Sequence, residues 1–408
     1  MKQSFRLVSW AAATSAALFT QPALAQPGVQ MSGRIQHWSG DRLSQPDNAT
    51  TNVEVWGKTK LPIGESVTLR GEGWVGLDPR GTGELGGDLR EGLIDIDAGP
   101  VSLLAGRQIF AWGRADRVNP TDVLAPRDYS RLVVEDDENR LGQVAVSLSV
   151  PLAGGVITGH WVPEFRASVL PLDIGASGLP VIKSKPAKES SYAVRFERFG
   201  GAIDFALVAA DTPDRLPWLS LGSTGLNPAL ILRAPRFQMV GADLATTVAN
   251  FGIRAEIARY FYRRTALQNL SPRKPMLAVT IGIDRSFRGQ WMIIAQAIVR
   301  RASGATPVTA QHQSVADRNA VVHGVWRKTT VGATLSVRKT FAANRGNAEL
   351  TGATLSGGGT FLQARVSFAV SDNVRIQLLG EHFNGPESSF FGRQSANDNL
   401  MIGLRVGY

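Results

Sequence analysis

Apolar and polar residues alternate along most of the chain from residue 29 onward. The segment LAVTIGID (277–284) places four aliphatic side chains on one face and small or polar residues on the other. The segments VRIQLLGE (374–381) and LMIGLRVGY (400–408) repeat this pattern. A period of two predicts β-strands that have one apolar and one polar face.

The predicted connections between these strands alternate in length. Short turns are expected at 61–65, 98–100, 152–155, 200–201, 249–250, 288–290, 328–330 and 371–373. Longer polar loops are expected near 39–49, 78–87, 110–139, 165–189, 212–233, 264–274, 302–317, 341–358 and 384–397. Counting strands between these breaks predicts about 18, with 16 as the alternative, and places both chain ends on the short-turn side.

This pattern favours a membrane barrel over a soluble sandwich. A sandwich needs a buried apolar face in each sheet, and it does not alternate short and long connections so regularly. Lipid instead demands closed backbone hydrogen bonding and an outward apolar stripe, while the interior can stay wet. We therefore predict an all-β fold, a transmembrane antiparallel β-barrel. The aromatic Tyr408 at the end of the last strand is typical of such barrels.

The N-terminal residues have the form of a secretory signal. Lys2 and Arg6 precede an uncharged apolar run over 7–19, and small residues follow at 22–25. We predict a signal peptide at 1–25 and a single outer-membrane barrel domain at 26–408 in a Gram-negative cell. Loss of the two basic residues lowers the formal net charge from +10 to +8.

The late strands carry arginines on their predicted inward face. Closure of the barrel joins them to the first strand and forms a basic wall of Arg34, Arg300, Arg338, Arg365, Arg375 and Arg405. Such a wall attracts anions, and arginine binds carboxylates and phosphates in a fork geometry. The alternative is that each arginine pairs with an acid from a neighbouring strand or from an inserted loop and only stiffens the lumen.

The third long loop contains the densest run of charge, AWGRADRVNPTDVLAPRDY (111–129). Its Asn-Pro and Ala-Pro steps favour turns, and a polar lumen can satisfy its paired charges. We predict that this loop folds inward as a constriction, and that the acids of EDDEN (135–139) meet the basic wall. The predicted constriction residues are Arg107, Trp112, Arg114, Asp116, Arg117, Asn119, Asp122, Arg127 and Asp128.

Catalytic and metal chemistry find little support in the sequence. The chain has no cysteine, its five histidines show no triad or metal-ligand spacing, and no glycine loop suited to phosphate is present. We expect no catalytic residue, no metal and no cofactor. Trp112 is expected to pack the base of the third loop, with stacking on a sugar ring as the alternative. The other tryptophans considered are expected to form interfacial girdles at strand ends: Trp38, Trp56, Trp74, Trp161, Trp291 and Trp326.

The segment LLAGRQIFAWGRADRVNPTD (103–122) resembles the "GRQ…WG…NP.D" region of porin-like outer-membrane proteins, including uncharacterised families close to the alginate-export type. The resemblance implies an 18-stranded barrel with a basic lumen that conducts an anionic substrate, in some members an acidic polysaccharide. Residue by residue, it points to Arg107, Gln108, Trp112, Gly113, Asn119, Pro120 and Asp122.

The function predicted is a passive channel for anionic solutes or an acidic polysaccharide. The alternative is a non-transporting surface or assembly protein, or an adhesin, that acts through its long loops; a hydrolase is least favoured. Expected partners are outer-membrane lipid, lipopolysaccharide and periplasmic export or uptake proteins, and no nucleic acid. The basic stretch VIKSKPAKES (181–190) suits lipopolysaccharide phosphates, although solvated loop charge explains it as well.

Overall fold

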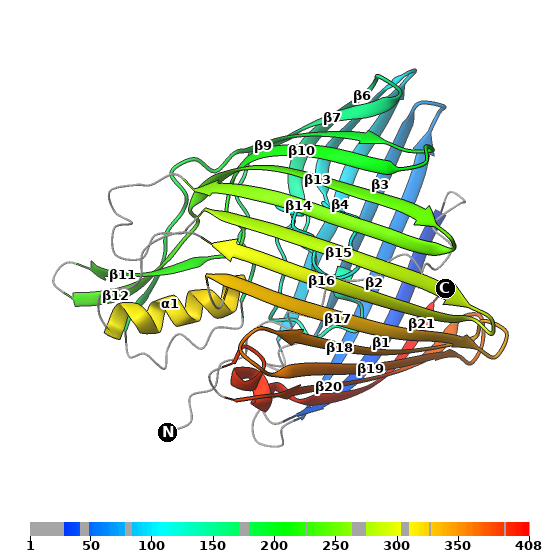
Figure 1. Cartoon of the computed structure of the whole chain (residues 1–408). Helices are drawn as coiled ribbons and strands as arrows, with labels where there is room; N and C mark the ends of the chain where they lie inside the picture. The colour runs from blue at the N-terminus through cyan, green and yellow to red at the C-terminus, as the bar shows by residue number, and fades with distance from the viewer. Residues whose placement is uncertain are drawn as a thin grey trace.

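The computed structural model describes residues 28–40, 49–77, 84–170, 179–224, 227–262, 275–302, 310–325, 328–386 and 389–407. The predicted signal peptide, Trp326 and Tyr408 lie outside these residues. Within them, 18 strands form one antiparallel sheet, which closes because β1 pairs with both β2 and β21 (Figure 1). The predicted 18-stranded barrel is therefore confirmed.

The barrel strands are β1 (Gly28–Gly40), β2 (Ala49–Ile63), β3 (Val67–Leu77), β4 (Leu85–Ala98), β5 (Val101–Gln108), β6 (Gln143–Leu152), β7 (Gly155–Val162), β9 (Ser191–Arg198), β10 (Asp204–Pro213), β13 (Arg236–Val248), β14 (Phe251–Tyr262), β15 (Met276–Phe287), β16 (Trp291–Ala302), β17 (Thr329–Phe341), β18 (Gly346–Leu355), β19 (Thr360–Ala369), β20 (Val374–Asn384) and β21 (Asn399–Gly407).

The strand count is correct, but one strand lies elsewhere than predicted. The breaks in the pattern place a strand at 318–327, where the structure has the helix α1 (Ala310–His323) instead. The predicted long loop at 341–358 is mostly β18, which follows a tight turn at 342–345. Ala342, Ala343 and Asn344 all have positive φ. Two alanines in that conformation give no glycine signal, so the turn is hard to recognise from the sequence.

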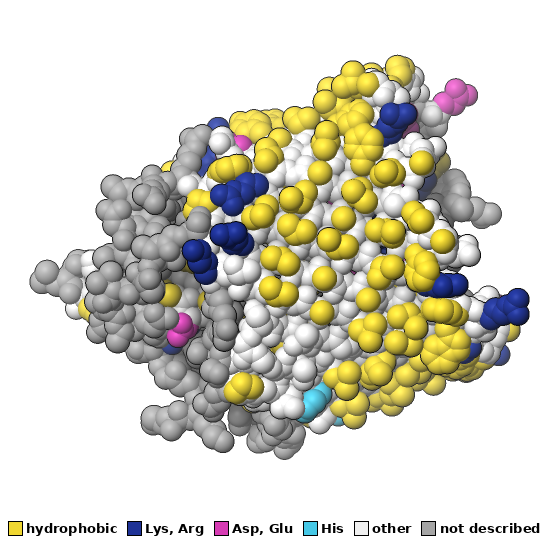
Figure 2. Space-filling view, in the orientation of Figure 1, with side chains coloured by type: hydrophobic (Ala, Val, Ile, Leu, Met, Phe, Trp, Pro, Cys, Tyr) yellow, Lys and Arg dark blue, Asp and Glu magenta, His cyan; other side chains and the backbone are white. Residues whose placement is uncertain are grey.

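The outer face of the barrel is apolar and exposed. Ile281, Leu335 and Ile402 are 54%, 51% and 55% exposed, and their neighbours along each strand point inward. Figure 2 shows this wall as a broad field of hydrophobic side chains. Exposed apolar surface on this scale is stable only against lipid, so the barrel spans a membrane.

The long-loop end carries structure beyond the barrel. A small sheet of β8 (Val181–Lys183), β11 (Trp218–Thr224) and β12 (Asn227–Arg233) lies beside α1 at one end of the molecule (Figure 1). The Asn319 side chain of α1 accepts a hydrogen bond from the backbone N–H of Leu219 and donates one to its carbonyl, both at 2.8 Å. No helix among the described residues is long and apolar enough to cross a membrane.

The third loop, residues 109–142 between β5 and β6, occupies the lumen. Its apolar side chains Phe110, Trp112 and Leu124 are buried in one cluster with residues of the barrel wall such as Phe237 and Met239. The short 3₁₀ helix η1 (Asp136–Asn139) lies in the same loop, and a second, η4 (Gly392–Asn397), precedes β21. The predicted inward fold of this loop is therefore observed.

Candidate functional site: the lumen and its inserted loop

One carboxylate of the barrel wall holds the base of the third loop. Glu256 on β14 accepts hydrogen bonds from the backbone N–H groups of Arg114 and Ala115, both at 2.7 Å. Its second oxygen accepts a bond from the Thr121 hydroxyl at 3.0 Å. Glu256 is 1% exposed, so its carboxylate is shielded from water where it binds the loop to the wall.

The backbone of the loop is shaped to approach this anchor. Gly113 has a φ of +95°, and a Cβ added there would lie 2.5 Å from a Glu256 oxygen. Only glycine fits such a conformation and such an approach. Beyond it, the Asn119 amide donates to the Trp112 carbonyl at 3.1 Å. The Tyr260 hydroxyl donates to the carbonyl of Pro120, which fastens the loop to β14 a second time.

Charged side chains of the loop reach several different strands. The guanidinium of Arg114 lies 2.9 Å from the Asp243 carboxylate of β13. Arg117 lies 2.8 Å from Glu349 of β18 and donates to the Thr351 hydroxyl at 2.6 Å. Asp116 lies 3.2 Å from Arg254 of β14. The loop thus crosses the lumen from its base at β5 and β6 and is tied to strands across the barrel, β13, β14 and β18.

Other predicted loop residues organise the loop itself. Asp122 lies between Arg140 at 2.7 Å and Arg127 at 3.4 Å. Asp128 accepts hydrogen bonds from the backbone N–H and the hydroxyl of Ser130 in a local turn. Arg107 is a correction to the predicted constriction set. It lies on β5, with 3.6 Å to Asp88, and donates to the Leu89 carbonyl, so it holds the strand end.

The acidic stretch of the loop meets the basic wall. Glu138 lies 2.7 Å from Arg34, and Glu135 lies 3.4 Å from Arg365. Between them, burial raises the pKa of the Asp136 carboxyl to about 6, in spite of the nearby Arg365 and Arg117. Acids supplied by the loop therefore neutralise part of the wall.

Arg300 lies apart from the other arginines of the predicted wall. It faces inward at the long-loop end of β16 and donates to the His323 carbonyl at 2.9 Å. Arg338 pairs in register with Met292, eight residues earlier on β16. At ~3.3 Å per residue, roughly 26 Å along the strand separates the two levels. The prediction of one continuous wall of six arginines is therefore wrong.

The remaining five arginines fall into two groups. Arg34 lies 3.3 Å from Glu54, besides its contact with Glu138, and Arg338 lies 3.2 Å from Glu349. With Arg365, these three match the interpretation of paired, stiffening charges. Arg375 and Arg405 differ, because neither has an ion pair with an acid among the described residues. Arg405 lies in register with both Arg34 and Arg375, so three cations line up across β1, β21 and β20.

The tryptophans of the early strands line the lumen, which corrects the predicted girdle. Trp38 and Trp56 are 1% and 7% exposed, and Trp56 stacks on Trp74 with 6.3 Å between ring centroids. Arg34 lies 4.4 Å from the Trp56 ring, and Arg131 of the third loop lies 3.8 Å from the Trp74 ring. Trp161 and Trp291 do lie on the outer face, at 47% and 45% exposure. Trp56 shares its strand face with Glu54 and Lys58, so period two alone could have placed it inward.

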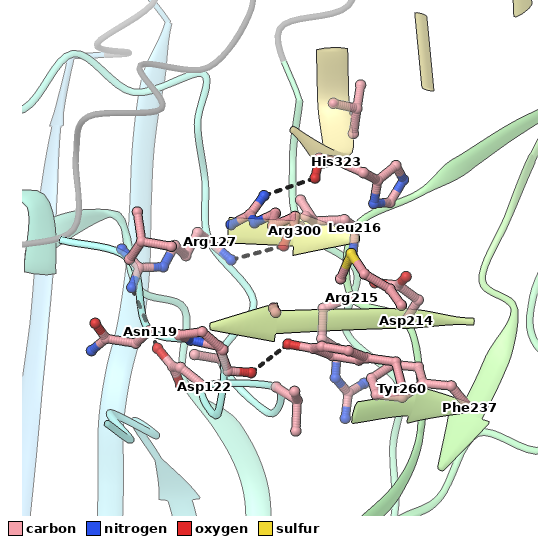
Figure 3. A pocket seen from close by; sticks show the side chains of 18 of the residues that line it. Asn119, Asp122, Arg127, Asp214, Arg215, Leu216, Phe237, Tyr260, Arg300 and His323 are labelled. Atoms are coloured by element: carbon pink, nitrogen blue, oxygen red, sulfur yellow. Dashed lines mark hydrogen bonds and ion pairs between the residues drawn. The ribbon is translucent and has the colours of Figure 1, made fainter. Parts of the chain in front are cut away.

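A cavity of about 190 Å³ lies on the long-loop side of the third loop, and we call it the outer cavity. Figure 3 shows Asn119, Asp122 and Arg127 of the loop facing Tyr260 and Phe237 of the wall, with Arg300 and His323 further out. Arg215, after β10, also lines it, donates to the Ser191 hydroxyl at 2.8 Å, and is 4% exposed. Its Nε and Nη1 have no hydrogen-bond partner among the described residues, and burial lowers its pKa to about 10.

A second cavity of about 530 Å³, the inner cavity, lies on the opposite side of the loop. Its lining comes from the short-turn ends of the strands and from the loop: among others Arg114, Asp116, Arg140, Arg195, Glu197, Arg254 and Arg338. Asn119 lines both cavities. The turn around Asn119 therefore separates an outer from an inner compartment. Across the described chain, no cluster of histidine or acidic side chains forms a metal site.

Comparison with known families places the chain. The model of a family described as "Protein of unknown function (DUF1302)" matches residues 90–408. The chain belongs to the DUF1302 family. No curated protein matches it.

Solved porins share the fold of this DUF1302 chain. OccAB3 of Acinetobacter baumannii is 8% identical with a TM-score of 0.57, and the match covers 94% of this chain and 99% of that one. A BenF-like porin from Pseudomonas fluorescens Pf-5 is 9% identical with a TM-score of 0.56, over 94% and 98% of the two chains. OpdK of Pseudomonas aeruginosa, solved with vanillate, is 11% identical with a TM-score of 0.55, over 93% and 97%. At these identities the likeness shows the barrel fold, and the predicted resemblance to alginate-export proteins stays a prediction.

Proposed function

We propose that this protein is an outer-membrane channel through which small organic anions diffuse. Arg375 and Arg405 carry this proposal. They lie side by side on the lumen face without an acidic partner among the described residues, next to Arg34. Cations without an ion pair, in a lumen with low-dielectric walls, focus the field and raise the local anion concentration.

The outer cavity supports an organic anion as the solute. Phe237, Tyr260 and Tyr262 give it an aromatic wall, and Arg215 offers a buried guanidinium with unused donors. An apolar body with a carboxylate suits such a lining. Small solutes fit better than an acidic polysaccharide, because the ion pairs Arg114–Asp243 on β13 and Arg131–Glu54 on β2 hold the third loop across the lumen. Vanillate, with which OpdK was solved, is a suitable first test solute.

Reversal potentials in planar bilayers under a salt gradient test the proposal. The wild-type protein should prefer anions. The double variant Arg375→Glu, Arg405→Glu replaces two cations that have no ion pair among the described residues with two anions beside Arg34, and should reverse the preference. The matched control is Arg288→Glu, at an exposed arginine in the turn between β15 and β16. This control should leave the potential unchanged.

Two results would contradict the proposal. Cation preference in the wild-type protein would show that the paired acids, and not Arg375 and Arg405, set the field of the lumen. A folded barrel that conducts no current would exclude a channel. It would favour the alternative of a surface protein that acts through the sheet of β8, β11 and β12 and through α1.

A further inference from the structure

An ordered row of side chains crosses the lipid-facing wall near the long-loop end. The strand registers place Trp161, Tyr192, Asp211, Gln238 and Phe261 in one line across β7, β9, β10, β13 and β14. The three aromatic residues are 45–47% exposed on the outer face. Aromatic side chains at this height mark the level at which hydrocarbon gives way to lipid head groups.

A hollow of about 710 Å³ lies in the wall at this row. One residue pair further into the membrane, the outward positions include Gly159 and Ala209, which have almost no side chain. Larger side chains border them, among them Leu148, Val194 and Val240. The hollow is thus an apolar groove that begins at the head-group level and faces lipid.

Basic side chains lie at the aromatic row and one residue pair further in. Lys188 lies beside Tyr192 of the row, with its ammonium 4.9 Å from the ring. Arg259 is in register with Val240, and its guanidinium reaches toward Phe261, 5.7 Å from the ring. Arg259 and Arg301 flank Leu277 in register, two strands apart, which is about 10 Å. Figure 2 shows basic side chains over the long-loop ends of β13–β16.

Three of these cations have no acidic partner among the described residues. Arg236 nearby pairs with Asp211 at 2.7 Å. By contrast, Lys188, Arg259 and Arg301 have no ion pair with an acid in the part of the chain that the structure describes. Basic residues on a lipid-facing wall are costly unless they lie at the interface, where an anionic head group can pair with them.

We propose that this groove binds a phosphorylated glycolipid of the outer leaflet. An acyl chain lies over Gly159 and Ala209, and the phosphates pair with Lys188 and Arg259, with Arg301 one further step along the wall. The aromatic row fixes the height of the head group. This proposal does not depend on channel activity.

Binding of lipid A that carries both phosphates, measured by native mass spectrometry in a non-ionic detergent, tests this site. The variant Arg259→Glu, Arg301→Glu should weaken binding about 30-fold or more, since each basic residue near a lipid surface contributes about a factor of five. Ala209→Leu should also weaken it by filling the groove. The matched control is Arg285→Glu, Lys339→Glu, at two cations that lie over Phe251 and Trp291 near the short-turn end.

Several outcomes would overturn the site. Equal binding of dephosphorylated lipid A, equal binding by the Arg259 and Arg301 variant, or an equal loss in the control would each do so. Tight binding of phosphatidylglycerol with the same dependence on these arginines would show a general phosphate site and not a glycolipid site. If the strand variant fails to fold, Lys188→Glu, in the connection before β9, applies the same test outside the barrel.

Discussion

Loss of the Glu256 carboxylate should release the third loop from the barrel wall. Glu256 receives two backbone N–H groups at 2.7 Å and the Thr121 hydroxyl at 3.0 Å. Each hydrogen bond to a charged group contributes about 1.5–3 kcal/mol. For Glu256→Ala, the two backbone bonds alone amount to roughly 3–6 kcal/mol of lost tethering.

Glu256→Gln gives a graded comparison. The amide oxygen can still accept from Arg114 and Ala115. Only the bonds from Thr121 are lost, from its hydroxyl at 3.0 Å and its backbone N–H at 3.4 Å, together about 1 kcal/mol. A loss of ~4 kcal/mol raises the population of the released loop by a factor of about 1,000, whereas 1 kcal/mol raises it about fivefold. The alanine variant should therefore differ strongly from wild type and the glutamine variant only slightly.

Single-channel recording in planar bilayers measures the effect. Glu256→Ala should show larger conductance and frequent steps between levels, because the loop no longer holds one position across the lumen. The control is Glu381→Ala, since Glu381 also faces the lumen but, among the described residues, accepts hydrogen bonds only from Gln363 and Asn399 of the wall. If the Glu256→Ala recordings match those of wild type, the anchoring role is wrong.

Two further predictions concern the stability of the loop. The pKa of Asp136 is raised from 3.8 to about 6, so the folded barrel binds this proton more tightly than the unfolded chain, and stability falls as pH rises from about 4 to 6. Asp136→Asn should flatten this decline, measured as the urea midpoint of unfolding against pH, and should stabilise the protein at pH 8 by about 3 kcal/mol. If the variant keeps the wild-type pH profile, Asp136 does not cause the decline. Gly113→Ala should destabilise by at least ~1–3 kcal/mol, because alanine tolerates neither the φ of +95° nor the contact with Glu256. Equal thermal midpoints for this variant and wild type would contradict the geometry.

The barrel was accessible to sequence reasoning because its signal is local and repeats. Period two determines which side of each strand faces lipid, and lipid requires the sheet of such strands to close because no edge can be left without hydrogen bonds. The same logic failed at α1 and β18. At 318–327, where a strand is predicted, the structure has part of the helix α1. The turn before β18 contains no glycine, so the sequence pattern does not reveal that strand. The predicted number of strands is still correct, because the strand wrongly placed at 318–327 offsets the missed strand β18.

Only part of the candidate site could be predicted from the sequence. The charges of the third loop and the arginines of the wall are visible as residues, but their pairing depends on tertiary contacts. Glu256 lies 142 positions along the chain from Arg114, so no local sequence pattern predicts the contact between them. The neutralisation of Arg34 by Glu138 is equally remote in sequence. What the structure adds is therefore which cations have no ion pair with an acid among the described residues.

The most direct test of the account is whether Asn119 lies in the path of the current. The chain contains no cysteine, so Asn119→Cys creates a single reactive thiol at the residue that lines both cavities. A negatively charged methanethiosulfonate reagent, added to either side of the bilayer, should remove most of the anion current. Ser130→Cys, on the same loop but outside both cavity linings, should retain it. Full modification of Cys at position 119 with no change in current would contradict the division of the lumen by the third loop.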